Sequence, residues 1–303
     1  MRGAGVIMLA LLAVSRLPAL AGPADFEAPE PVELQGYEGD AMEPFLSRDG
    51  QYLFFNNRND PGVQTDIHMA ERIDALHFRY LGKLAGANSD ALDGVPSLAR
   101  DGSFVFVSPR AYDAAHRTLW IADFRDGVVL DPELVRGDYS RAKGGWLNID
   151  AEISADGGTL YYVENKWRLF GGGIGTSNLR MAEKTSDGGF SKTDRSVSDF
   201  DAINSDKLEF APATTEDELT LYFTRVDRKA LKNGVDKGFG IFVSTRPDRS
   251  QPFGTPQRIG AITGYVEGPT ISPDGCRLYF HKRIGDRFDI QSARKSDCEA
   301  SES

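Results

Sequence analysis

The sequence predicts an all-β protein, a β-propeller of five four-stranded blades, with six blades as the alternative number. The first observation is a motif that occurs five times: a short apolar segment, a polar turn containing an aspartate, and a run of aromatic and β-branched residues. The turn aspartates are Asp49, Asp101, Asp156, Asp217 and Asp274. They lie 52, 55, 61 and 57 residues apart, a spacing typical of propeller blades or other repeat arrays.

The second observation is that both faces of each predicted sheet are apolar. Each copy of the motif predicts two antiparallel strands joined by a tight turn, with Asp-Gly at the turn in four of five copies. An aliphatic residue follows four positions after the aspartate and an aromatic residue five positions after it, as in Leu53-Phe54 and Leu278-Tyr279. Because neighbouring residues of a strand face opposite sides, such a sheet must pack between two others. Sheets arranged radially around an axis meet this requirement for every repeat.

A third strand is predicted after each hairpin, at residues 65–72, 117–124, 177–184, 239–246 and 288–295. Residues 69–84 also show a helical spacing of apolar side chains, but the other copies favour two strands on either side of Asp74. A fourth strand is expected in the first four copies, most clearly at Phe253–Ile262.

The third observation concerns the two ends of the chain. The fifth copy has no residues left for a fourth strand, whereas Phe26–Leu34 is similar to Phe253–Ile262, with Pro29 in the place of Pro256. We therefore expect the N-terminal strand to complete the last blade and close the ring. A ring closed in this way leaves no exposed sheet edge at its seam.

The fifth copy also carries a family resemblance. Its turn Ser272-Pro273-Asp274-Gly275, its strand Leu278-Tyr279-Phe280 and its later Asp289-Ile290 resemble the WD40-like β-propeller repeats of the TolB type, called PD40 repeats. The resemblance spans residues 43–295. It implies a propeller that serves as a binding platform, and such families often have six or seven blades. The fourth copy departs from the pattern, because Glu216-Asp217-Glu218 stands in place of the turn glycine.

The N-terminus has the features of a secretory signal peptide. Arg2 precedes the apolar run Val6–Val14, which is too short to span a bilayer, and Ala19-Leu20-Ala21 resembles a cleavage site. We expect a signal peptide at 1–21, an N-terminal segment at 22–42 that supplies the outer strand of the last blade, the propeller at 43–296 and a C-terminal tail at 297–303. The mature protein is then exported, periplasmic or secreted, and does not span a membrane.

Charge and cysteine content restrict the partners and the compartment. The formal net charge is −10, which makes nucleic acid an unsuitable partner because of repulsion by its phosphates. The two cysteines, Cys276 and Cys298, flank neighbouring strands of the fifth copy. In an oxidising compartment they are expected to form a disulfide that fastens the C-terminus to the last blade.

Carboxylates lie at the beginning of each predicted first strand. They are Glu43, Asp93, Asp150 with Glu152, Glu209 and Glu267. Since the first strand lines the channel of a propeller, these groups are expected to gather at one channel mouth. Like charges raise one another's pKa values, which suits general acids and bases or cation ligands. The predicted chemistry is glycoside cleavage or binding of a structural Ca²⁺ ion.

A structural role for these carboxylates is the competing interpretation. They can pair with basic residues at the neighbouring strand ends, namely Arg58, Arg110, Arg225 and Arg283. A residue used in every blade is more easily explained by the blade than by one active site. The four histidines show no metal-ligand spacing, so no metal ligands and no cofactor other than the Ca²⁺ ion are predicted.

Aromatic residues in the long connections of copies two and three are a second candidate surface. They are Tyr112, Tyr139, Trp146, Trp167 and Phe170. Exposed aromatic rings there can stack on a sugar or pack against a partner protein, and capping of the core is the alternative.

The sequence favours an exported propeller that acts as a binding or scaffold module for a cell-envelope protein or a carbohydrate. The alternative is a carbohydrate-active enzyme, a glycoside hydrolase or lyase, with Glu43, Asp150 and Glu209 as candidate acids. Geometry separates the two hypotheses. Carboxyl groups that converge in a pocket without basic neighbours favour catalysis, whereas carboxylates paired within their own blades favour a structural role.

Overall fold

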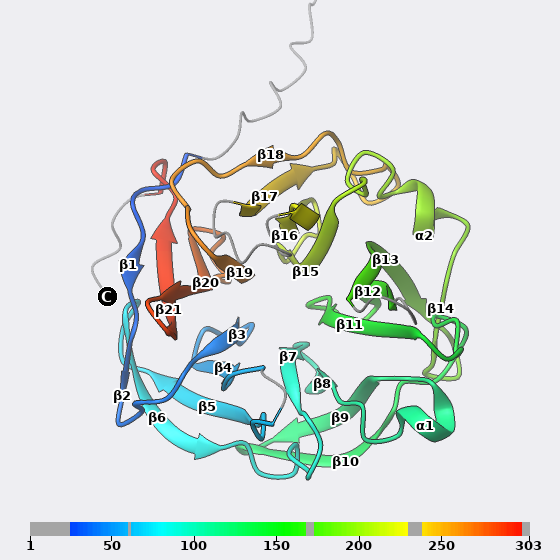
Figure 1. The fold of residues 1–303 in the computed structure, drawn as a ribbon, viewed down its shortest axis with the longest axis horizontal. Helices are drawn as coiled ribbons and strands as arrows, with labels where there is room; N and C mark the ends of the chain where they lie inside the picture. The colour runs from blue at the N-terminus through cyan, green and yellow to red at the C-terminus, as the bar shows by residue number, and fades with distance from the viewer. Residues whose placement is uncertain (1–24, 60–61, 168–172, 230–237, 299–303) are drawn as a thin grey trace, which may run out of the picture.

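The computed structural model describes residues 25–59, 62–167, 173–229 and 238–298, so the expected signal peptide lies outside the described residues. The chain forms a ring of five sheets, which confirms the predicted five-bladed propeller (Figure 1). Each blade begins with an innermost strand beside the central channel. These strands are β3 (Met42–Leu46), β7 (Gly94–Leu98), β11 (Trp146–Ile153), β15 (Leu208–Thr214) and β19 (Val266–Ile271).

Three more strands complete each blade towards the outside. The second strands are β4 (Tyr52–Asn56), β8 (Ser103–Val107), β12 (Thr159–Trp167), β16 (Thr220–Val226) and β20 (Arg277–Ile284). The third strands are β5 (Ile67–Arg72), β9 (Leu119–Arg125), β13 (Ile174–Lys184), β17 (Phe239–Thr245) and β21 (Arg287–Arg294). The outer strands are β6 (His77–Lys83), β10 (Val128–Leu134), β14 (Phe190–Ser191), β18 (Gln257–Arg258) and, in the fifth blade, β1 (Glu30–Pro31).

Two single-turn helices lie in the connections, α1 (Tyr112–Ala115) and α2 (Arg195–Ser198). None of the described helices has the length and apolarity needed to cross a bilayer. The two strands predicted around Asp74 are confirmed as β5 and β6, whereas the fourth strand expected at Phe253–Ile262 is shortened to Gln257–Arg258. Pro252 and Pro256 lack the N–H group that a ladder requires.

The N-terminal segment closes the ring as predicted and then continues onto the first blade. Strand β1 pairs with β21 in the fifth blade, and β2 (Glu33–Gln35) pairs in parallel with β6. The N–H of Val32 donates to the carbonyl of Ile290, and the next N–H, of Glu33, donates to the carbonyl of Leu76. Successive N–H groups of an extended chain point in opposite directions, so one segment pairs with both blades across the seam. Glu33–Gln35 therefore belongs to the first blade, not to the last blade as expected.

The apolar core consists of five clusters, one between each pair of neighbouring blades. Leu53 lies in the cluster between the fifth and first blades, and the adjacent Phe54 lies in the cluster between the first and second. Both side chains are fully buried. The prediction of sheets that are apolar on both faces is thereby confirmed, and burial of each such side chain contributes roughly 1.5–3 kcal/mol.

Every innermost strand contains a β-bulge at the same place, where its pairing with the second strand shifts register. At this bulge the residue six positions before the turn aspartate has a positive φ. These residues are Glu43 (49°), Val95 (53°), Asp150 (49°), Ala211 (46°) and Gly268 (64°). A bulge bends the strand and redirects a side chain. All five residues line the channel.

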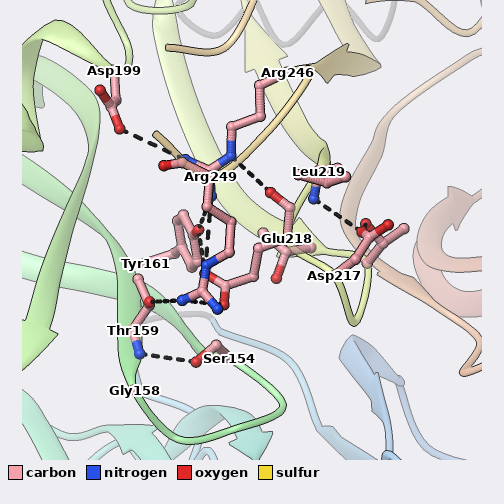
Figure 2. A network of polar contacts seen from close by, with 12 residues as sticks. Ser154, Gly158, Thr159, Tyr161, Asp199, Asp217, Glu218, Leu219, Arg246 and Arg249 are labelled. Atoms are coloured by element: carbon pink, nitrogen blue, oxygen red, sulfur yellow. Dashed lines mark hydrogen bonds and ion pairs between the residues drawn. The ribbon is translucent and has the colours of Figure 1, made fainter. Parts of the chain in front are cut away.

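In the turn of the fourth blade a glutamate, Glu218, stands in place of the glycine and takes part in a network of polar contacts (Figure 2). Glu218 has a φ of 58°, the conformation that Gly50, Gly102, Gly157 and Gly275 adopt in the other turns. Its side chain is buried, accepts a hydrogen bond from the Tyr161 hydroxyl at 2.6 Å and pairs with Arg249 at 2.9 Å. Glu218 thus joins the fourth blade to the third, which explains why this copy departs from the sequence pattern.

The predicted disulfide between Cys276 and Cys298 is present, with 5.8 Å between the two Cα atoms. Next to it, Phe26 forms an isolated bridge with Lys295. The disulfide therefore fastens the end of the last blade where the N-terminal segment pairs with it.

Candidate functional site

A cavity of about 260 Å³ opens at one end of the central channel. Three carboxyl groups line it, those of Glu43, Asp150 and Glu267, which belong to the first, third and fifth blades. The other described residues that line it are Met42, Asn59, Ile149, Ile174, Phe210, Val226, Phe239, Tyr265 and Phe288. None of these described lining residues is a lysine or an arginine.

The bulges bring the three carboxyl groups together. Glu43 and Asp150 occupy the same position in their strands, six residues before the turn aspartate, and both have the positive φ of the bulge. Glu267 lies one residue before the equivalent Gly268. A side chain on Gly268 would collide with Glu43, since a Cβ atom there would lie 2.6 Å from Oε2 of Glu43. Glycine at 268 therefore leaves room for the Glu43 carboxyl group beside Glu267.

His281 lies beside two of the carboxyl groups. It is fully buried on β20, directly opposite Glu267 on β19. Its Nδ1 atom accepts a hydrogen bond from the backbone N–H of Glu43 at 3.1 Å, and its Nε2 atom lies 3.7 Å from Oε2 of Glu267. Because Nδ1 accepts, the neutral ring carries its proton on Nε2. His281 therefore directs an N–H towards Glu267, and at 3.7 Å this N–H forms no hydrogen bond with Glu267 or with any other described residue.

Burial and mutual repulsion change the pKa values of these groups. Burial, together with the charges of Asp150 and Glu267, raises the pKa of Glu43 well above its usual value. Burial and the charge of Glu267 raise the pKa of Asp150 to about 7, although the N–H of Ala211 donates to it at 3.2 Å. The charge of Glu267 is also the largest cause of the raised pKa of the Tyr265 phenol. Carboxyl groups that hold protons near neutral pH are suited to general acid–base chemistry.

Other carboxylates that were predicted for the site form ion pairs with arginines instead. Fully buried Asp93 contacts Arg110 at 2.6 Å, and fully buried Glu209 contacts Arg225 at 2.9 Å. Each pair lies within its own blade, as the structural interpretation predicted. Asp93 and Glu209 stand two residues earlier in the repeat than Glu43 and Asp150, before the bulge. The structure therefore separates Glu209 from the two other candidate acids and brings Glu267 to them.

Glu152 lies deeper in the channel, beyond the cavity. It accepts hydrogen bonds from Arg48 at 3.1 Å and from the backbone N–H of Thr214 at 2.7 Å. Arg48 comes from the turn of the first blade, so this contact crosses the channel. Glu152 is therefore a structural contact between blades and not a member of the cavity.

The candidate aromatic residues that the structure describes do not line the cavity. Trp146, at the start of β11, has Arg141 4.3 Å from its ring centre and Lys166 5.5 Å from it, so cations already cover the ring. Trp167, at the end of β12, is 45% exposed. Tyr139 is fully buried in the core, the Tyr112 hydroxyl donates to the Trp146 carbonyl, and Phe170 lies outside the described residues.

A group of three side chains could in principle hold a metal ion. One possible ligand atom from each of Glu43, Glu267 and His281 lies within 4.8 Å of the other two. The hydrogen bond from Glu43 directs an N–H of His281, not a lone pair, towards Glu267, so the histidine fits poorly as a metal ligand. A Ca²⁺ ion takes six to eight oxygen ligands, of which the three carboxyl groups supply a part. Ca²⁺ binding remains a prediction, and a melting temperature that falls on adding a chelator would test it.

No family model matches the chain, and no curated protein matches it. Among solved structures, it is similar to a thermostable family-43 glycoside hydrolase, with 12% identity, a TM-score of 0.53 and coverage of 88% of this chain and 91% of that one. The catalytic domain of the GH62 α-L-arabinofuranosidase of Coprinopsis cinerea has 9% identity, a TM-score of 0.53 and coverage of 91% and 98%. TolB from Acinetobacter baumannii has 13% identity and a TM-score of 0.45, and the match covers 86% of this chain and 55% of TolB. At these identities the likenesses show the fold alone, and membership of the PD40 repeat family remains a prediction.

Sequence reasoning missed His281 because the histidines were judged by metal-ligand spacing. The positions of Glu267 and His281 relative to the hairpin turn could have indicated that the two residues lie opposite each other. Glu267 stands seven residues before Asp274 and His281 seven residues after it, and the bulge sets these two opposite each other.

Proposed function

We propose that the chain is a glycoside hydrolase whose reacting groups are Glu43, Asp150 and Glu267. The observation that carries the proposal is their convergence in one cavity with no lysine or arginine among its described lining residues. Asp93, Glu152 and Glu209 are each neutralised by an arginine elsewhere. Perturbed carboxyl groups in a cavity are typical of functional sites, whereas paired ones are typical of structure.

Glycoside hydrolysis requires a carboxylic acid that protonates the leaving oxygen and a carboxylate that activates water or attacks the sugar. Glu43 suits the acid, since its raised pKa keeps a proton available. Glu267 suits the base or nucleophile, because the Tyr265 hydroxyl and the His281 N–H face it and can hold a carboxylate in place. Asp150 raises the pKa of Glu43 by its charge and so controls how readily that proton is released.

Two further considerations support this class of reaction. The solved structures named as a family-43 glycoside hydrolase and a GH62 α-L-arabinofuranosidase share the fold of this chain, so the fold accommodates such chemistry. A lyase, by contrast, removes a proton beside a substrate carboxylate that must be neutralised, and the described lining offers no basic side chain for this.

A binding or scaffold module for a cell-envelope protein or a carbohydrate is the second candidate. The exposed indole of Trp167, at the end of β12, favours it, because such a ring can anchor a partner or a sugar. Export is proposed for either function. The disulfide between Cys276 and Cys298 suits an oxidising compartment.

The test is hydrolysis of a panel of chromogenic aryl glycosides by the purified mature chain. Glu43→Gln and Glu267→Gln should each lower the rate by about 10²–10⁴-fold, the usual contribution of a general acid or base, and Asp150→Asn should change the pH dependence of the rate. Glu209→Gln is the matched control, since it is also a carboxylate at the start of an innermost strand but contacts Arg225. Hydrolysis that persists in Glu43→Gln and Glu267→Gln, or a panel without any substrate, would refute the proposal.

A further inference from the structure

The channel closes immediately beyond the three carboxyl groups. The next space along it has a volume of about 20 Å³. One residue of each blade, the one after the bulge, surrounds this constriction: Pro44, Pro96, Ala151, Pro212 and Pro269. A space of this size accommodates about one water molecule and no sugar ring.

Arg48 closes the channel further along. Its guanidinium donates to the carbonyl of Ile153 at 2.8 Å and to Glu152 at 3.1 Å, and it lies 3.4 Å from the carbonyl of Thr214. These contacts join the first blade to the third and fourth. Arg48 and Glu152 are both buried, so this ion pair blocks the channel permanently. In the described part of the chain the cavity therefore has one opening, and a polysaccharide cannot pass through it.

The volume of the cavity limits its ligand to a small unit. Pockets for drug-sized ligands measure about 300–1,000 Å³. The cavity at the channel mouth, at about 260 Å³, is below this range. One sugar ring is the unit of carbohydrate that suits it.

The walls combine aromatic faces with acidic groups. The rings of Phe239 and Tyr265, from the fourth and fifth blades, stack with 3.9 Å between their centres, and Phe288 meets Tyr265 edge-on. A sugar ring has an apolar C–H face that packs on such surfaces and hydroxyl groups that hydrogen-bond to carboxyl groups. Arg283 lies 4.9 Å from the ring centre of Tyr265, and Arg58 lies 5.4 Å from that of Phe288. Among the described residues, the charged groups that line the cavity itself are the carboxyl groups, so a sugar that carries its own carboxylate would meet like charges there.

We infer that this cavity binds a single, terminal sugar ring without an acidic group, so that the enzyme removes one neutral sugar at a time from a chain end. The inference rests on the proposed function for the removal step and on the cavity alone for the binding step. The two steps therefore need separate measurements.

Binding is measured by saturation-transfer NMR on the purified mature chain carrying Glu43→Gln, so that no turnover interferes. The probes are neutral pentoses, hexoses, 6-deoxyhexoses and N-acetylhexosamines, compared with glucuronate and galacturonate. We expect at least one neutral sugar to bind, and the uronates to bind at least about tenfold more weakly. Adding Tyr265→Ala should abolish neutral sugar binding, whereas adding Glu209→Gln should leave it unchanged.

Cleavage is measured by chromatography of the products that the wild-type chain releases from oligosaccharides of defined length. Release of monosaccharides alone supports the inference. Longer products in the first turnovers, preferential binding of uronates, or no binding of any neutral sugar would overturn it. Neutral sugar binding without cleavage of any glycoside would support the inference for the cavity and refute the proposed hydrolase activity.

Discussion

Across the seam between the fifth and first blades, Nδ1 of His281 accepts a hydrogen bond from the backbone N–H of Glu43 at 3.1 Å. The positive φ of Glu43, 49°, belongs to the bulge from which this N–H points to the histidine. The same ring faces Glu267 through Nε2. One buried side chain thus connects the closure of the ring with the placement of two carboxyl groups of the candidate site.

Replacing His281 should weaken this connection in a graded way. His281→Leu leaves the Glu43 N–H without its acceptor, and an unsatisfied buried polar group costs about 1–3 kcal/mol of the free energy of unfolding. His281→Gln provides an amide oxygen and an amide N–H in similar places, so it should lose less. Urea unfolding of both variants gives the comparison, with the half-exposed His77 replaced by glutamine as the control. Equal losses in the leucine and glutamine variants would contradict a role for the hydrogen bond.

The raised pKa of Asp150 predicts that stability falls as the pH rises. The pKa of its carboxyl group is about 7, against about 4 for an exposed aspartate. Between these values the folded chain binds more protons than the unfolded chain, so the free energy of unfolding decreases with increasing pH. The urea midpoint of the wild type should be lower at pH 8 than at pH 5, and Asp150→Asn should reduce the difference. Groups with a lowered pKa, such as Asp156, act in the opposite direction in both proteins. A pH dependence unchanged by Asp150→Asn would contradict this prediction.

The pH dependence of glycoside hydrolysis should reflect the same ionisations. The carboxyl group of Asp150 ionises at about pH 7, and its charge then raises the pKa of Glu43 and makes Glu43 a weaker acid, so kcat/KM for glycoside hydrolysis should fall as the pH rises through about 7. Asp150→Asn cannot ionise, so the residual activity of that variant should lose this part of the profile. The measurement is the pH profile of the best aryl glycoside found in the screen. A descending limb at the same pH in Asp150→Asn would assign it to another group.

The fold could be predicted because its signals are local and repeated. Pairs such as Leu53-Phe54, buried on opposite faces, occur in every copy, and the missing fourth strand of the last copy indicated ring closure. What could not be predicted is the division of Phe26–Leu34 between two blades. It depends on the alternating N–H directions of Val32 and Glu33, which are set only once both blades stand beside the segment.

The candidate site was harder to predict because carboxylates at nearby positions of one strand have different roles. Asp93 and Glu209 face an arginine of the same blade, whereas Glu43 and Asp150, two positions later in the repeat, face the channel. The bulge that causes the difference is followed by proline in four of the five blades, but the residue at the bulge itself has no common type. Its positive φ is adopted by five different residue types, and only Gly268 favours it intrinsically.

The turn of the fourth blade gives a prediction in which two effects oppose each other. Glu218→Gly relieves the cost of a left-handed residue, about 1–2 kcal/mol. It also removes the charged acceptor of the buried Tyr161 hydroxyl, a hydrogen bond worth about 1.5–3 kcal/mol, and the partner of the half-exposed Arg249, a pair worth at most about 1 kcal/mol. The loss is larger, so the variant should be less stable by about 1 kcal/mol in urea unfolding, although it restores the turn glycine. Glu216→Ala removes an exposed pair with Arg100 and should cost at most about 1 kcal/mol. A glycine variant as stable as the wild type would contradict the role assigned to Glu218.

The disulfide should stabilise the seam more than the rest of the ring. Cys276 and Cys298 are 22 residues apart, and closing a loop of this length contributes roughly 3 kcal/mol in the chain-entropy model. The double variant Cys276→Ser/Cys298→Ser should lose about this much free energy of unfolding. The N–H groups of Glu27 and Val32, which donate to β21 carbonyls, should then exchange with solvent faster than those of the central strand β8. A reducing agent should reproduce the effect in the wild type and leave the double variant unchanged. Uniformly faster exchange in all five blades would show that the disulfide acts on global stability and not on the seam.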